Sequence, residues 1–174
     1  MKSKENIVFL GMMGAGKTSI GFLVSKKLNL DFLDIDQLIE KELGMKISKI
    51  FEKKGEKYFR EIEEKITLKC LKIKKIVISL GGGAFLNKSI RDEILSNHSS
   101  YWLKLNPNML IKRIRNNSKR PIAFKLTNNE LIDLIKKRSN IYSKALYKID
   151  CDNRTKNEIV NEILNIYETN KISS

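Results

Sequence analysis

The residues from Gly11 to Thr18 read GMMGAGKT, which fits the pattern G-x-x-x-x-G-K-[ST] in full. Glycines leave no Cβ between the backbone and an oxyanion, so bare N–H groups can curl around phosphate oxygens. Lys17 would reach the β- and γ-phosphates of a nucleotide, and the Thr18 hydroxyl would be a Mg²⁺ ligand. An apolar run precedes the pattern and a helical pattern follows it, which favours a nucleoside triphosphate-binding loop over a ligand-free turn. We expect the nucleotide to contact Gly14, Ala15, Gly16, Lys17, Thr18 and Ser19.

Two carboxylates follow a second apolar run. Asp34 and Asp36 lie two positions apart, so on a strand covering 32–35 and its end they would project to the same side. One could help to hold Mg²⁺ while the other accepts a proton from a substrate hydroxyl. The alternative is that Asp36 is the N-cap of a helix beginning at Gln37. The spacing alone leaves both interpretations open.

A third group consists of an acid–base pair and a glycine cluster. Arg60 and Glu63 are three positions apart in a helical pattern, where Glu63 could hold the guanidinium in place. A solvated ion pair is the commoner meaning of this spacing. Residues Gly81 to Gly83 are consecutive glycines at the end of an apolar run. They weaken a strand for no structural gain, which predicts that a ligand or another backbone approaches there.

The elements that must position these residues alternate along the chain. Short apolar or β-branched runs are separated by segments with helical spacing, which predicts a parallel sheet covered by helices on both faces. The expected strands lie at 7–10, 32–35, 76–80, 101–105 and 147–149. A polar stretch with one proline, RNNSKRPIAFKLTNNE, predicts a flap between two helices.

The composition excludes several classes of protein. The chain has 174 residues, 41% hydrophobic and 31% charged, which fits one globular domain. No apolar run is long enough to cross a membrane, and no secretory leader is visible, so we expect a cytoplasmic protein. Cys70 and Cys151 are interpreted as packing residues. A single histidine, His98, excludes a histidine-rich metal site. The net charge of +14 is spread along the chain, which favours anionic small substrates over nucleic acid.

Taken together, these motifs resemble the shikimate kinase family over nearly the whole chain. The matching features are the loop at 11–18, the D-x-D at 34–36, FREIEE, SLGGGA, the RP dipeptide at 120–121 and KKRSNIY at 136–142. The resemblance implies a three-layer α/β/α P-loop NTPase fold of the nucleoside-monophosphate-kinase-like type, with a five-stranded parallel sheet and a mobile lid. It also implies one domain over 1–174, a lid at about 112–127 and a substrate-binding helical region at about 37–62.

The resemblance implies transfer of a phosphoryl group from ATP to the 3-hydroxyl of shikimate, with one Mg²⁺ per subunit. Asp36 would bind the substrate hydroxyls and act as the base. Arg60 and Arg138 would bind the shikimate carboxylate, together with the backbone N–H of Gly82. Charge-assisted hydrogen bonds of this kind contribute on the order of 1.5–3 kcal/mol each.

The family pattern also assigns residues to the nucleotide side. Asp34 and Thr18 would support Mg²⁺, and Arg120 on the lid would close over the phosphates. Arg113 and Arg154 would lie beside the adenine. The family often has a proline two residues after the second arginine, where this chain has Lys156.

Three rival functions compete with this interpretation. Another small P-loop kinase, for gluconate or a nucleoside monophosphate, explains Gly81–Gly83 together with Arg60 and Arg138 less well. A nucleic-acid-binding NTPase would need clustered basic or aromatic residues, whereas the single tryptophan, Trp102, lies in a strand that we expect to be buried. A catalytically silent relative would be expected to lose Lys17 or Asp36. We therefore expect shikimate and ATP as partners, a monomer, and no binding to nucleic acid or membranes.

Overall fold

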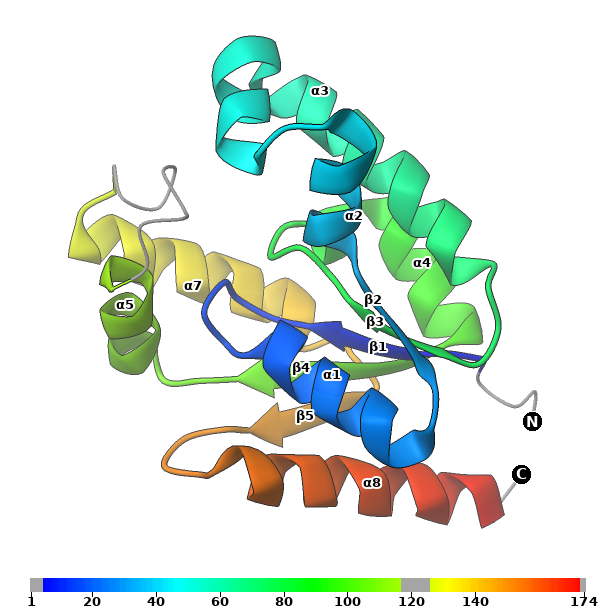
Figure 1. Ribbon diagram of the computed structural model, residues 1–174. Coiled ribbons are helices and arrows are strands. Elements are labelled where there is room, and N and C mark those ends of the chain that lie inside the picture. Colours follow the sequence, from blue (N-terminus) through cyan, green and yellow to red (C-terminus); the bar gives the residue numbers. More distant parts are fainter. Residues whose placement is uncertain (1–4, 117–125, 173–174) are drawn as a thin grey trace.

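The computed structural model describes residues 5–116 and 126–172 (Figure 1). Within these ranges the chain forms a sheet of five parallel strands in the order β2-β3-β1-β4-β5, surrounded by helices. The strands are β1 (Ile7–Leu10), β2 (Asp31–Asp34), β3 (Ile76–Ser79), β4 (Ser99–Lys104) and β5 (Tyr147–Asp150). The helices are α1 (Lys17–Leu28), α2 (Ile35–Leu43), α3 (Ile47–Leu71), the short 3-10 turn η1 (Ala84–Leu86), α4 (Lys88–Asn97), α5 (Pro107–Arg115), α7 (Asn128–Tyr142) and α8 (Lys156–Ile172).

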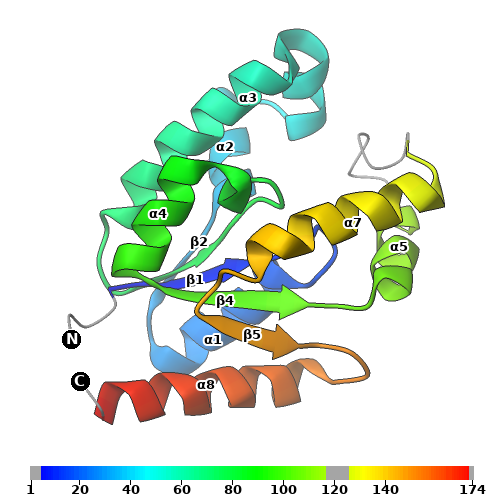
Figure 2. The same cartoon turned by 180° about the vertical axis from the view of Figure 1, so that it is seen from behind.

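The helices make two layers, one on each face of the sheet. Helices α1 and α8 lie on one face (Figure 1), and α4 and α7 cover the other face together with α3 (Figure 2). All four residues of β1 are buried, as expected for a central strand that carries helices on both sides. The three-layer arrangement with a five-stranded parallel sheet confirms the fold predicted from the alternating pattern.

Parallel pairing brings the carboxyl ends of the strands to one edge of the sheet. Phe9 of β1 and Asp34 of β2 both pair with Ser79 of β3, so these three strands end side by side. Leu10 pairs with Trp102 of β4, whose side chain is buried. In open α/β sheets the ligands bind at this edge, and the predicted functional residues follow these strand ends.

Two local features differ from the sequence predictions. Strand β2 ends at Asp34, and Asp36 lies in the first turn of α2, so the two carboxylates do not share a strand face. The region expected to be helical at about 37–62 is also divided: α2 ends at Leu43, and Gly55 interrupts α3 with non-helical dihedral angles (φ 83°, ψ 172°). Glycine accepts this positive φ without the steric cost that a Cβ would bring.

The two cysteines are free thiols in the hydrophobic interior, which confirms that they are packing residues. Within the described ranges, no helix is both long enough and apolar enough to cross a membrane.

Candidate functional site

The loop between β1 and α1 has the backbone of an anion cradle. Gly11, Gly14 and Gly16 all have positive φ, at 135°, 82° and 97°. A Cβ on Gly11 would stand 2.8 Å from the carbonyl oxygen of Leu103, so this position tolerates no side chain. Gly16 is the N-cap of α1 and provides no side-chain cap. The first N–H groups of α1 therefore point outward without a side-chain acceptor, at the positive end of the helix dipole.

Lys17 folds back over this loop. Its ammonium group donates to the carbonyl oxygens of Gly11 at 3.0 Å and Met12 at 3.1 Å, and the side chain is buried. Both acceptors belong to the loop itself, so the charge is held at the cradle before any phosphate arrives. This is the position that the sequence motif predicts for a lysine that contacts the β- and γ-phosphates.

Thr18 and Asp34 bring hard oxygen ligands together beside the cradle. The Thr18 hydroxyl donates to Asp34 Oδ2 at 2.6 Å, and Asp34 is buried. The second carboxylate oxygen of Asp34 accepts the backbone N–H of Gln37 at 3.1 Å, which caps α2. The N-cap of this helix is thus Asp34 and not Asp36, so the alternative interpretation of Asp36 is wrong. A hydroxyl and a carboxylate in contact are the donor types that Mg²⁺ prefers, and the pair fits this ion.

The glycine turn after β3 is packed against charged side chains. A Cβ on Gly81 would lie 2.6 Å from both Asp36 Oδ1 and Glu63 Oε1. A Cβ on Gly83 would lie 2.7 Å from Arg60 Cζ. Glycine is required here because two carboxylates and a guanidinium approach the backbone directly, whereas the sequence predicted a ligand or another backbone at this point.

Arg60 lies between two carboxylates of its own helix. Its Nη1 donates to Glu63 Oε2 at 2.6 Å, while Nε and Nη2 donate to Glu56 Oε1 at 3.2 and 3.1 Å. The Glu63 side chain is only 3% exposed, so of the two interpretations of this spacing the structure supports the one in which Glu63 holds Arg60. Glu63 Oε1 is buried and has no hydrogen-bond partner in the described part of the chain.

The electrostatics of this pair reflect burial and mutual attraction. Burial is the largest effect on Glu63 and raises the pKa of its carboxyl, with a further contribution from the charge of Asp36, while Arg60 opposes the shift. Burial alone would lower the pKa of Arg60, but the charges and hydrogen bonds of Glu63 and Glu56 outweigh it and raise the pKa. The 2.6 Å contact supports a formed ion pair.

Arg138 approaches the same turn from α7. Its Nη1 donates to the Gly82 carbonyl at 3.3 Å and lies 3.9 Å from the sulfur of Met12. A Cβ on Gly82 would be 3.3 Å from the backbone nitrogen of Met13, so the turn also touches the phosphate-binding loop. The hydroxyl of Tyr142 donates to the same carbonyl oxygen as Arg138. The four residues Asp36, Arg60, Gly82 and Arg138 are thus gathered around one turn facing the nucleotide loop.

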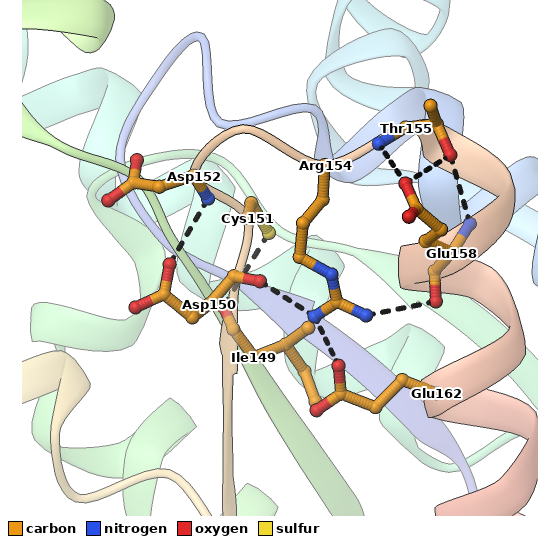
Figure 3. Close-up of polar contacts among 8 residues, drawn as sticks. All are labelled: Ile149, Asp150, Cys151, Asp152, Arg154, Thr155, Glu158 and Glu162. Atoms are coloured by element: carbon orange, nitrogen blue, oxygen red, sulfur yellow. Dashed lines mark hydrogen bonds and ion pairs between the residues drawn. The ribbon is translucent and has the colours of Figure 1, made fainter.

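The two arginines expected near the adenine have different surroundings. Arg113 on α5 donates to the carbonyl of Gly14 at 3.2 Å, so it lies against the phosphate-binding loop. Arg154 instead ties the β5–α8 connection to α8 (Figure 3): it donates to the carbonyl of Asp150 at 2.9 Å, to the carbonyl of Glu158 at 3.1 Å and to the Glu162 carboxylate. These contacts do not bear on whether Arg154 lies beside the adenine, and that role stays a prediction.

Arg120 lies outside the described residues, as do residues 117–125 of the expected lid. Residues 112–115 of the segment assigned to the lid form the end of α5. Sequence reasoning did not single out Tyr142 or Glu56, although both are four positions from a predicted arginine on the same helix face. The i, i+4 spacing was the signal that could have found them.

Comparison with known proteins gives a consistent result. A family model described as shikimate kinase matches residues 13–168. The shikimate kinase of Sulfurihydrogenibium sp. (strain YO3AOP1) is 39% identical over 160 residues, which cover 92% of this chain and 96% of that protein. The shikimate kinase of Bacillus subtilis (strain 168) is 40% identical, with 97% and 90% covered. Among solved structures, shikimate kinase from Acinetobacter baumannii in complex with shikimate has a TM-score of 0.90 and 30% identity, with 98% of this chain and 96% of that chain covered.

Proposed function

The chain belongs to the shikimate kinase family, and from this premise we propose how its residues phosphorylate shikimate. The reaction transfers the terminal phosphoryl group of ATP to the 3-hydroxyl of shikimate and gives shikimate 3-phosphate and ADP. It belongs to the pathway to chorismate and the aromatic amino acids. ATP is the co-substrate, and the roles of individual residues below are proposals that rest on the geometry of the site.

The nucleotide phosphates bind in the loop from Gly14 to Ser19. The N-terminus of α1, which has no side-chain cap, and the positive-φ glycines support this assignment, because backbone N–H groups at a helix N-terminus can donate to phosphate oxygens. Lys17 exchanges its two carbonyl acceptors for oxygens of the β- and γ-phosphates. Its charge offsets the negative charge that is spread over the transferred group in the transition state. Arg113, already in contact with Gly14, and Arg154 border the adenine, and Arg120 closes over the phosphates.

Thr18 and Asp34 would hold Mg²⁺ through the hydroxyl and carboxylate oxygens that now contact each other. When bound, the ion neutralises charge on the phosphate oxygens. Asp34 is fixed for this task because its other oxygen caps α2. The same cap places the first turn of α2, and with it Asp36, next to the metal side of the site.

Shikimate binds between α3, α7 and the Gly81–Gly83 turn. Its carboxylate accepts hydrogen bonds from both Arg60 and Arg138, and from the N–H of Gly82. Two observations support this: Arg138 Nε is buried without a hydrogen-bond partner among the described residues, and Arg60 is held rigidly by Glu63. Asp36 binds the substrate hydroxyls. As the 3-oxygen forms its bond to the γ-phosphorus and the bond to the β-phosphate bridging oxygen breaks, Asp36 accepts the hydroxyl proton and ADP leaves.

The observation that carries this proposal is the convergence of Asp36, Arg60 and Arg138 on a turn that touches the phosphate-binding loop. In this proposal the two arginines that bind the carboxylate, and Asp36 as the base, lie across one turn from the phosphates of ATP. We further propose that the chain acts as a cytoplasmic monomer that does not bind nucleic acid. Its charge of +14 would then serve to attract anionic substrates. Light scattering at micromolar concentration tests the monomer.

The activity is tested by following ADP release from MgATP with shikimate, gluconate or AMP as acceptor. We expect turnover with shikimate alone, and its absence would reject the proposal. Asp36→Asn should lower kcat by about 10²-fold or more while ATP binding stays nearly intact. Asp31→Asn makes the same charge change at the exposed, opposite end of β2 and serves as the control, with kcat close to that of the unmodified protein. A normal kcat for Asp36→Asn would remove that residue from the role of base.

A further inference from the structure

The carbonyl oxygen of Gly82 accepts hydrogen bonds from two side chains of one helix. The Tyr142 hydroxyl and Arg138 Nη1 both donate to it, and the two residues lie one turn apart on the same face of α7. Nothing in the roles proposed above uses the tyrosine. Its position against the backbone that carries the substrate-binding N–H raises the question of what the second donor does.

Burial and ring packing fix the Tyr142 hydroxyl against the Gly82 carbonyl. The residue is only 2% exposed, and its ring packs against that of Trp102 with centroids 6.1 Å apart, so the phenol has little freedom to turn away. Burial raises the pKa of the hydroxyl, which keeps it protonated and therefore able to donate. A buried hydroxyl of this kind is expensive to leave unpaired, and Gly82 is its partner.

The hold of Arg138 on the same carbonyl is weaker. Its contact is 3.3 Å, just beyond the usual range, and the same Nη1 also donates to the Met12 sulfur at 3.9 Å. The Nε of the same guanidinium is buried without a hydrogen-bond partner in the described part of the chain. An arginine with a long bond and an unused buried donor is prepared to exchange its carbonyl for a stronger, charged acceptor.

The peptide groups on both sides of Gly82 are fixed by different partners. The carbonyl of Gly81, which shares its peptide plane with the Gly82 N–H, accepts the N–H of Ala84 at 3.2 Å. The next peptide plane begins with the Gly82 carbonyl, and Tyr142 and Arg138 are its side-chain donors. If Arg138 leaves, the tyrosine is the side chain that keeps this carbonyl paired and the turn in place.

We infer that Tyr142 is a positioning residue for the substrate carboxylate: its hydroxyl satisfies the Gly82 carbonyl and thereby releases Arg138 to bind the acid. The inference rests on the proposed function, because it assigns the carboxylate of shikimate to Arg138 and Gly82. It adds a residue that touches no substrate. Without the hydroxyl, Arg138 is the one side-chain donor among the described residues to this half-buried carbonyl, and substrate binding then takes that donor away.

Tyr142→Phe removes the hydroxyl and keeps the ring, and Tyr101→Phe is a matched control at another buried tyrosine. Loss of one net hydrogen bond predicts a rise of about two- to tenfold in KM for shikimate. We expect kcat within twofold of the unmodified protein and no change in KM for ATP. Tyr101→Phe should leave the shikimate KM unchanged. A Tyr142→Phe enzyme with a normal shikimate KM, or with equal rises in both KM values, overturns the inference.

A double-mutant cycle with Arg138→Ala separates positioning from a general structural role. In the Arg138→Ala background, Tyr142→Phe should change the shikimate KM less than twofold, because the side chain that the tyrosine releases is gone. The same rise in both backgrounds would indicate a purely structural tyrosine and reject the inference. Should Tyr142→Phe fail to fold, 3-fluorotyrosine at position 142 provides a more acidic donor of similar shape. It should lower the shikimate KM, and an unchanged KM would count against the inference. If the unmodified protein lacked shikimate turnover, the proposed function itself would fail, which is a distinct outcome.

Discussion

Gly81→Ala is the sharpest test of where the base stands. The added Cβ would lie 2.6 Å from Asp36 Oδ1 and equally close to Glu63 Oε1, whereas ordinary contacts of a Cβ begin at 3.4 Å. Both carboxylates, or the backbone of the turn, must therefore move by about 0.8 Å to restore ordinary contacts. Gly81 does not have a left-handed φ, so the alanine brings no backbone strain of its own.

The displacement has a larger effect on chemistry than on folding. Glu63 is tied to Arg60 at 2.6 Å and sits in the interior, so Asp36 is the carboxylate that gives way more easily. A misplacement of about 1 Å in a reacting group can cost about 10²-fold in rate. We expect kcat for shikimate phosphorylation to fall by about that factor. The free energy of unfolding should fall by about 1 to 3 kcal/mol, as for other overpacked sites.

The assay is steady-state ADP release with shikimate varied at saturating MgATP, combined with urea unfolding of the same preparations. Gly44→Ala is the control, because Gly44 has a φ of 63° and nothing within 4 Å of its Cβ position. Position 44 falls within the 37–62 region assigned to substrate binding, but the added Cβ meets no other group, so the alanine displaces no side chain and its kcat should stay normal. A Gly81→Ala protein that folds and turns over at the original rate would refute the assignment of Asp36 as the base beside this turn.

Three further predictions follow from the same geometry. Gly83→Ala places a Cβ 2.7 Å from Arg60 Cζ, so it should raise KM for shikimate about tenfold with a smaller effect on kcat. Steady-state kinetics with both substrates varied test this, and equal rises in KM for shikimate and for ATP would contradict it. Burial raises the pKa of Glu63 above 4.5, so the unfolded state loses this proton at a lower pH than the folded state does, and the free energy of unfolding falls as the pH rises above about 4.5. Glu63→Gln should reduce this fall between pH 4 and pH 7, as measured by urea unfolding. An identical pH dependence in the variant would contradict the prediction. Burial raises the pKa of Cys151 to about 12 and also raises that of Cys70, so a thiol reagent at pH 8 should label the native protein slowly and label two thiols after unfolding; rapid native labelling would contradict the burial of both side chains.

The sequence was sufficient to predict the sheet, the phosphate-binding loop and the meeting of Arg60 with Glu63. These features depend on local patterns: apolar runs of strand length, glycines followed by lysine and threonine, and an i, i+3 spacing on a helix. The position of Asp36 was predicted only in part, because the end of β2 depends on Asp34 capping α2, a choice between two similar carboxylates. Boundaries of this kind shift by a residue or two when either aspartate can cap.

The bond between Tyr142 and Gly82 could not be predicted, because it joins residues 60 positions apart through the packing of α7 on the turn. The engagement of Arg154 by Glu162 is likewise a matter of how the loop after β5 meets α8. Both arise from tertiary contacts between elements whose separate patterns give no distance between them. Local spacing determines which residues share a helix face, and packing determines which partner that face meets.

The break at Gly55 divides α3 into two helical pieces, and only the second carries residues of the site. Arg60 and Glu63 belong to the piece that packs on the body of the molecule, whereas residues 47–54 precede a glycine whose surroundings are empty. Ile50 is buried and the ring of Phe51 packs on that of Phe59 at 4.6 Å, so only the exposed positions 49 and 52–54 of the shorter piece can be varied without disturbing the arginine. A surface library directed to these four positions should leave the anchoring chemistry intact.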